Sequence, residues 1–130
     1  MFNYRPYIES LVSYMKKNGY TFTPYPKIIL DNRKLTGNPV FRPTGFYDPE
    51  EKKVVIYVNG RAPKDCLRSL AHELIHHKQN VEGRLGNGAY DGQRIVDDKK
   101  LTALESESFL KGNLIFRSWT ETTKKNEINK

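Results

Sequence analysis

Apolar residues recur at helical spacing in three segments of the chain. The first segment is Tyr7–Lys17, the second begins at Pro63 and reaches about Gln79, and the third begins after Asp97 or Asp98. Spacings of three and four residues between apolar side chains are typical of a helix that buries one face. The predicted starts of the second and third helices agree with this spacing, because proline is favoured at the first helical position and aspartate caps helix N-termini. The apolar positions within these helices are Ile8, Leu11, Val12 and Met15, then Leu67, Leu70, Ala71, Leu74 and Ile75, and then Leu101, Leu104, Leu110 and Leu114.

Shorter apolar runs between the first and second helices predict strands. Lys27–Leu30 is one such run. Thr44–Tyr47 and Lys53–Val58 are two more, and the turn residues Asp48–Glu51 between them indicate a β-hairpin. The glycine-rich stretch Gly83–Gly92 predicts a loop between the second and third helices. This order of elements predicts an α+β fold, in which a small sheet that includes the hairpin is packed on one side by the second helix and by further helices.

The length and composition are those of one globular domain. The chain has 130 residues, of which 37% are hydrophobic, and no apolar run approaches the roughly 20 residues that a membrane span needs. We expect the domain to occupy residues 1–120 and a charged, flexible tail to occupy residues 121–130. The first residues lack the apolar region of a secretory signal. Cys66 is the single cysteine, which excludes an internal disulfide framework and favours a reducing, cytoplasmic setting.

The net charge is positive. The chain has 22 lysines and arginines against 15 acidic residues, a formal charge of +7. The basic residues are spread along the sequence in pairs such as Lys16–Lys17 and Lys124–Lys125, and no block reaches the five to eight clustered basic residues that indicate a nucleic-acid patch. We therefore interpret them as solvated surface. A nucleic-acid partner is compatible with the charge but is not supported by a basic cluster.

The three histidines of the chain lie in one stretch of six residues within the second predicted helix. His72-Glu73-Leu74-Ile75-His76 has the form H-E-x-x-H, and His77 follows directly. Residues four apart share a helix face, so the imidazoles of His72 and His76 are predicted to converge on one ion. Two neutral imidazoles and an oxygen ligand suit zinc and leave a fourth position for water, whose pKa falls towards about 7 on zinc. Glu73, about 100° further round the helix, can reach that water without binding the ion.

The third ligand is expected to be a carboxylate, because all three histidines lie at positions 72–77 and the chain has no distant histidine to complete the site. The candidates are Glu105, Glu107 and Asp91, and we favour Glu105. Ser108 and Gly112 lie on the same predicted helix face as Glu105, and their small size permits close approach to the second helix. Glu107 projects about 200° round the helix from Glu105. We therefore expect its side chain to face solvent or to contact a residue that lies behind the ligands.

The two segments together resemble a known family of enzymes. H-E-L-I-H at His72–His76, followed by L-E-S-E-S-F at Leu104–Phe109, is similar to the glutamate-zincin metallopeptidases. The closest resemblance is to the minimal ones, the minigluzincins, and to the short H-E-x-x-H proteins of phages and mobile elements. The second family motif is a glutamate, two residues and a small residue, which matches Glu105 and Ser108, with serine in place of the usual alanine. The resemblance covers about residues 44–117 and includes the hairpin before the helix.

The resemblance implies a zincin-like single domain that hydrolyses peptide bonds with Zn²⁺. His72, His76 and Glu105 would hold the zinc, and Glu73 would act as general base and then as general acid. Related enzymes add a donor to the oxyanion that forms on the substrate, for which Tyr90, His77 and Arg117 are the candidates. The edge strand near residues 45–47 would bind an extended protein or peptide substrate by strand addition. We expect narrow specificity, because broad proteolysis inside a cell is hazardous.

Two other functions compete with a peptidase. One is a nucleic-acid-associated binding protein in which zinc is a structural staple, and the other is a catalytically inactive interaction module. Glu73 argues against both, because a structural zinc site fills its four positions with protein ligands and needs no general base.

Overall fold

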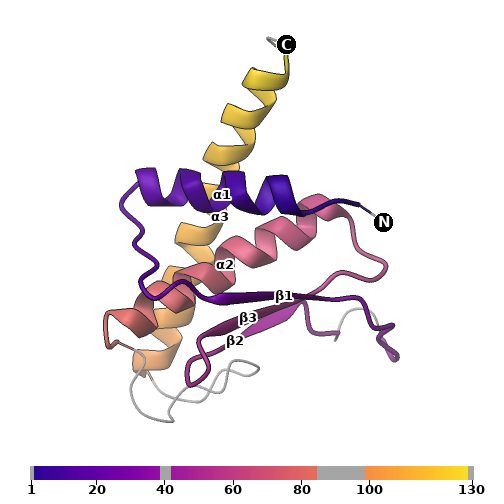
Figure 1. The fold of residues 1–130 in the computed structure, drawn as a ribbon. Coiled ribbons are helices and arrows are strands. Elements are labelled where there is room, and N and C mark those ends of the chain that lie inside the picture. The colour runs from indigo at the N-terminus through magenta and orange to yellow at the C-terminus, as the bar shows by residue number, and fades with distance from the viewer. Residues whose placement is uncertain (1, 39–41, 85–98, 129–130) are drawn as a thin grey trace.

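The structure confirms an α+β fold. The computed structural model describes residues 2–38, 42–84 and 99–128, and these form three helices and a three-stranded mixed sheet in a single domain. Figure 1 shows the arrangement. The elements are α1 (Arg5–Lys17), β1 (Lys27–Asp31), β2 (Gly45–Asp48), β3 (Lys53–Tyr57), α2 (Pro63–Val81) and α3 (Lys99–Ile128). All six predicted helices and strands are therefore confirmed, whereas the expected caps Asp97 and Asp98 lie outside the described residues.

The sheet has the order β1-β3-β2. β2 and β3 form the predicted antiparallel hairpin, with Tyr47 opposite Val54. β1 pairs with β3 in parallel, with Ile28 opposite Val54, and the sequence pattern did not predict this pairing. Alternate residues of β3, Val54 and Ile56, are fully buried on the side of the helices. The central strand therefore fixes the sheet against the helical layer, and β2 is an edge strand.

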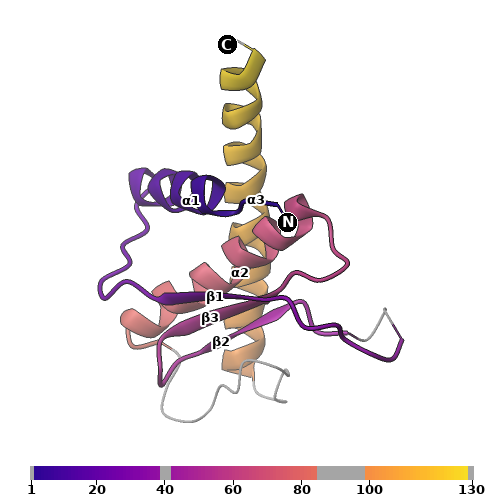
Figure 2. The same ribbon diagram turned by 45° about the vertical axis from the view of Figure 1, so that its right-hand side comes forward.

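α2 is the central element of the fold. It contacts β2 and β3 of the sheet and both of the other helices, α3 and α1. Figures 1 and 2 show α2 between the sheet and α3, with α1 crossing α3 on the same side of the sheet. The helices therefore cover one face of the sheet, as the order of elements predicted. Among the residues that the structure describes, no helix has both the length and the apolar character that a bilayer span requires.

α3 packs through a narrow face that contains small residues. Leu104, Ser108, Phe116 and Trp119 are buried on this face, and Gly112 lies among them. Leu110 and Leu114 lie in α3 as expected, but their side chains are 60% and 59% exposed. The apolar residues of this helix therefore did not by themselves identify its buried face.

The C-terminal half of α3 is attached to α1. The indole nitrogen of Trp119 donates a hydrogen bond of 3.0 Å to the Ser10 hydroxyl, and the hydroxyls of Tyr14 and Ser118 also form a hydrogen bond. α3 then continues to Ile128, so the segment expected as a flexible tail is helical as far as that residue. Its last turns project beyond α1 (Figure 2).

Gly112 sets the distance between α2 and α3. A Cβ atom at this position would lie 3.1 Å from Cα and 3.3 Å from the backbone nitrogen of His72. One turn earlier, the Ser108 hydroxyl donates a hydrogen bond of 2.7 Å to the carbonyl oxygen of His72. Both contacts are with the backbone of the first motif histidine, so the small residues predicted to permit close approach do so.

We expect Gly112→Ala to destabilise the fold. The new methyl group meets backbone rather than a flexible side chain, and overpacking of this kind costs about 1–3 kcal/mol. Alanine recovers about 1 kcal/mol through its higher helix propensity. The free energy of unfolding in urea should therefore fall by about 1 kcal/mol. Ser106→Ala, at an exposed position of α3, is the control for propensity alone and should not lower it. A Gly112→Ala protein more stable than the parent would contradict the close approach.

Candidate metal centre

Three side chains of α2 converge on one point. His72, Glu73 and His76 each offer a ligand atom, and these atoms lie within 4.8 Å of one another. The two imidazole rings have centroids 5.0 Å apart. Spacing of four residues on one helix face therefore brings the two histidines together as predicted. This group could hold a metal ion.

Glu105 joins the two histidines from α3. Its carboxylate oxygens lie 2.8 Å from Nε2 of His72 and 3.0 Å from Nε2 of His76. Burial alone would raise the pKa of Glu105, but the hydrogen bonds and charges of His72 and His76 together lower that pKa well below its usual range. A negatively charged oxygen donor thus faces both ring nitrogens, which is the arrangement expected if Glu105 is the third ligand.

The orientation of His76 is fixed from behind by Gln79. The Gln79 amide nitrogen donates to the carbonyl oxygen of Leu104 at 3.0 Å, so the amide oxygen is the atom that lies 2.8 Å from Nδ1 of His76. Nδ1 therefore carries a hydrogen, and neutral His76 has its lone pair on Nε2.

The donor set at His76 fits a cation. With the lone pair on Nε2, a neutral imidazole faces a carboxylate oxygen of Glu105 only 3.0 Å away. Two lone pairs repel at this distance unless a proton or a metal ion lies between them. Two ring nitrogens and one carboxylate are also ligands that zinc accepts, so the residues present fit a divalent metal ion.

Glu73 is the buried acid of the group. Its side chain is 6% exposed and forms no hydrogen bond or ion pair with another of the described residues. Burial raises the pKa of Glu73 to about 8. The charge of His72 opposes this rise, and the charge of Glu105 adds to it. A carboxyl group with a raised pKa beside possible metal ligands is typical of a functional site.

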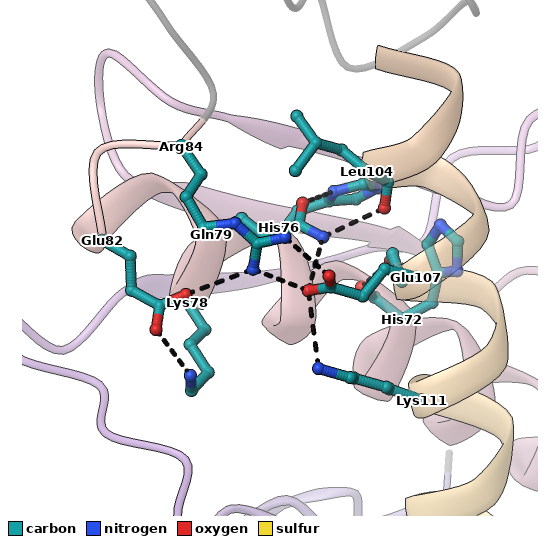
Figure 3. Close-up of polar contacts among 10 residues, drawn as sticks. His72, His76, Lys78, Gln79, Glu82, Arg84, Leu104, Glu107 and Lys111 are labelled. Atoms are coloured by element: carbon teal, nitrogen blue, oxygen red, sulfur yellow. Dashed lines mark hydrogen bonds and ion pairs between the residues drawn. The ribbon is translucent and has the colours of Figure 1, made fainter. Parts of the chain in front are cut away.

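Glu107 does not point at the histidines. Its carboxylate accepts two hydrogen bonds from Arg84, of 2.8 and 2.6 Å, and one of 3.3 Å from the Gln79 amide (Figure 3). These partners, Arg84 first, lower the pKa of Glu107 to about 2. Glu107 therefore lies behind the candidate ligands as a hydrogen-bond partner, which is one of the two positions that the sequence analysis allowed. Asp91, the remaining ligand candidate, lies outside the described residues.

His77 is a structural histidine. It is fully buried, its Nδ1 lies 2.7 Å from the Tyr47 hydroxyl, and its Nε2 lies 2.7 Å from the carbonyl oxygen of Pro24. Nε2 must donate to the carbonyl, so Nδ1 accepts from Tyr47, and the Asn80 amide donates to the same hydroxyl. Burial lowers the pKa of His77 and keeps it neutral. Both ring nitrogens are engaged, so His77 does not supply an oxyanion donor.

Of the other two oxyanion candidates, the structure describes only Arg117. Arg117 is exposed and pairs with Glu121, and it lies 12 residues after Glu105, which is about 18 Å along α3. Tyr90 lies outside the described residues. Of the two candidates that the structure describes, neither His77 nor Arg117 is placed to donate to an oxyanion at the site.

Sequence reasoning missed Gln79 and Arg84. The available signal was an amide side chain three positions after His76, on the same helix face as the two motif histidines, and Gln79 is fully buried there. Arg84 gave no signal, because its partner Glu107 is distant in sequence.

Comparison with protein-family models, with curated proteins and with solved structures finds no match for this chain. The argument for function therefore depends on the geometry of the site.

The adjacent histidines His76 and His77 should separate metal binding from stability. His77→Phe leaves the Tyr47 hydroxyl and the Pro24 carbonyl without their buried partner, which costs about 1–3 kcal/mol per group. We expect its free energy of unfolding to fall while the affinity for zinc is kept. His76→Phe should instead lose the affinity. Urea unfolding of the metal-free proteins and zinc competition with a chromophoric chelator measure the two properties. Loss of zinc binding in His77→Phe with retention in His76→Phe would contradict the assignment.

Proposed function

We propose that this protein is a zinc-dependent peptidase with a minimal, glutamate-zincin type of site. The observation that carries the proposal is the convergence of two histidine Nε2 atoms and the Glu105 carboxylate beside the buried Glu73. The two segments that supply these residues are the ones whose motifs resemble that family.

Zinc is the metal that we assign to the site. His72, His76 and Glu105 form a set of two nitrogens and one oxygen, the composition of catalytic zinc sites with three protein ligands. When bound, zinc lowers the pKa of a coordinated water and polarises the carbonyl of a substrate. A purely structural zinc site would have a fourth protein ligand, and the other acid that the described residues bring to this group, Glu73, suits a different role.

Glu73 is the proton carrier of the proposed reaction. Its carboxylate, kept from bulk water by burial, is a stronger base than an exposed glutamate. The positive charge of an ion at the histidines would favour its ionised form at neutral pH. Glu73 would then take a proton from the attacking water and pass it to the leaving amine, so that the residue is unchanged after one turnover.

The proposed substrate is an extended protein or peptide segment. β2 is an edge strand and contacts α2, the helix that carries the histidines. An edge strand offers unpaired backbone groups to a further strand, so a substrate backbone would pair with β2. Narrow specificity would then come from the substrate side chains. Cys66 is the single cysteine and is buried and free, which suits activity in the reducing cytoplasm.

Glu73→Gln should abolish hydrolysis and keep zinc. Glutamine has nearly the same shape but cannot take a proton, and Glu73 is not among the proposed ligands. We expect the zinc-loaded parent to cleave peptides of a proteome-derived library, as detected by mass spectrometry. Glu73→Gln should cleave none while it binds zinc like the parent. His76→Ala should lose both properties.

Two controls accompany this experiment. A chelator added to the parent should stop cleavage, and zinc added back should restore it. The same cleavage products from parent and Glu73→Gln would contradict the proposed mechanism.

A further inference from the structure

Gln79 is an unusual residue for the core. It is fully buried in α2, one turn after His76, where an apolar residue would fill the space between α2 and α3. Burial of an amide is costly unless its hydrogen bonds are satisfied. Every hydrogen bond found for the side chain is directed at the metal centre or at α3: to His76, to the Leu104 carbonyl and to Glu107.

The hydrogen bonds that the Gln79 amide nitrogen donates fix the direction in which the amide oxygen points. The amide nitrogen faces two acceptors, the Leu104 carbonyl oxygen at 3.0 Å and a Glu107 oxygen at 3.3 Å. Rotation of the amide by 180° would place its oxygen against both acceptors and lose both hydrogen bonds. The oxygen is therefore held toward Nδ1 of His76 and accepts its hydrogen.

The outer end of this chain of contacts is also held. Arg84 donates to both carboxylate oxygens of Glu107, and the Lys111 ammonium lies 3.8 Å from one of them (Figure 3). Paired hydrogen bonds between a guanidinium and a carboxylate fix both groups in one plane. Glu107 is thus a fixed acceptor for Gln79, and Gln79 is a fixed acceptor for His76.

We propose that Gln79 is a positioning residue of the metal centre, which fixes the His76 tautomer that presents Nε2 as a ligand. Histidine ligands are generally held by a hydrogen bond from the ring nitrogen that does not bind the metal, and loss of that partner typically costs 10–100-fold in metal affinity. The inference rests on the metal site of the proposed function. It does not require that the site hydrolyse peptides.

The test compares three substitutions. Gln79→Met keeps the volume and removes the hydrogen bonds. Gln79→Glu keeps an acceptor for His76, but it cannot donate to the Leu104 carbonyl and it places a second carboxylate 3.3 Å from Glu107. Asn80→Ala is the matched control, because the next side chain of α2 makes two hydrogen bonds of 3.0 Å, to the Tyr47 hydroxyl and the Pro49 carbonyl, away from the histidines.

Three measurements are made on each full-length protein. Zinc affinity is obtained by competition with a chromophoric chelator, the ligand geometry from the visible spectrum of the cobalt(II)-loaded protein, and stability from urea unfolding of the metal-free protein. We expect Gln79→Met to bind zinc about 10–100-fold more weakly with an altered cobalt spectrum. Gln79→Glu should be less stable than the parent but should bind zinc more tightly than Gln79→Met. Asn80→Ala should lose stability only.

The outcomes distinguish this role from a structural one. Zinc affinity and a cobalt spectrum in Gln79→Met equal to those of the parent would overturn the proposal, and so would affinities that simply follow stability across the three variants. A parent that takes up no zinc would overturn both this proposal and the proposed function. A parent that binds zinc but cleaves no peptide would overturn the peptidase alone.

Discussion

The close contact between α2 and α3 is the constraint on which the candidate site depends. Gly112 and Ser108 place the backbone of α3 against the backbone of His72, and Glu105 lies one turn before Ser108. A larger residue at either position would separate the helices and withdraw the carboxylate from the ring nitrogens. Helix packing normally brings axes to within 8–10 Å of each other, and small residues at the contact favour the lower end of that range. The ligand set is thus a product of packing as much as of the H-E-x-x-H motif.

The site also separates its two acidic residues by environment. Glu105 is surrounded by histidine nitrogens, which lower its pKa, whereas burial raises the pKa of Glu73. One carboxylate is therefore suited to bind a cation and the other to exchange a proton. The two roles follow from what each side chain touches, since the residue type is the same.

The sequence predicted those parts of the structure that depend on local spacing. The six elements, the convergence of His72 and His76, and the small residues of α3 all follow from periodicity within one segment. The parallel pairing of β1 with β3 did not follow, because β2 and a long connection separate these two strands along the chain. The roles of His77 and Gln79 also required the structure, because Pro24 and Leu104, their respective partners, lie far from them along the chain.

The placement of the candidate ligands on two helices has a consequence for the energetics of the fold. His72 and Glu105 are 33 residues apart, so an ion shared between them would act as a cross-link that closes a long loop. Because the two ligands come together only in the folded chain, binding of the ion to the native state adds stability that grows with the logarithm of the free metal concentration. With an ion bound, the resistance of the folded chain to proteolysis would therefore depend on the supply of that metal.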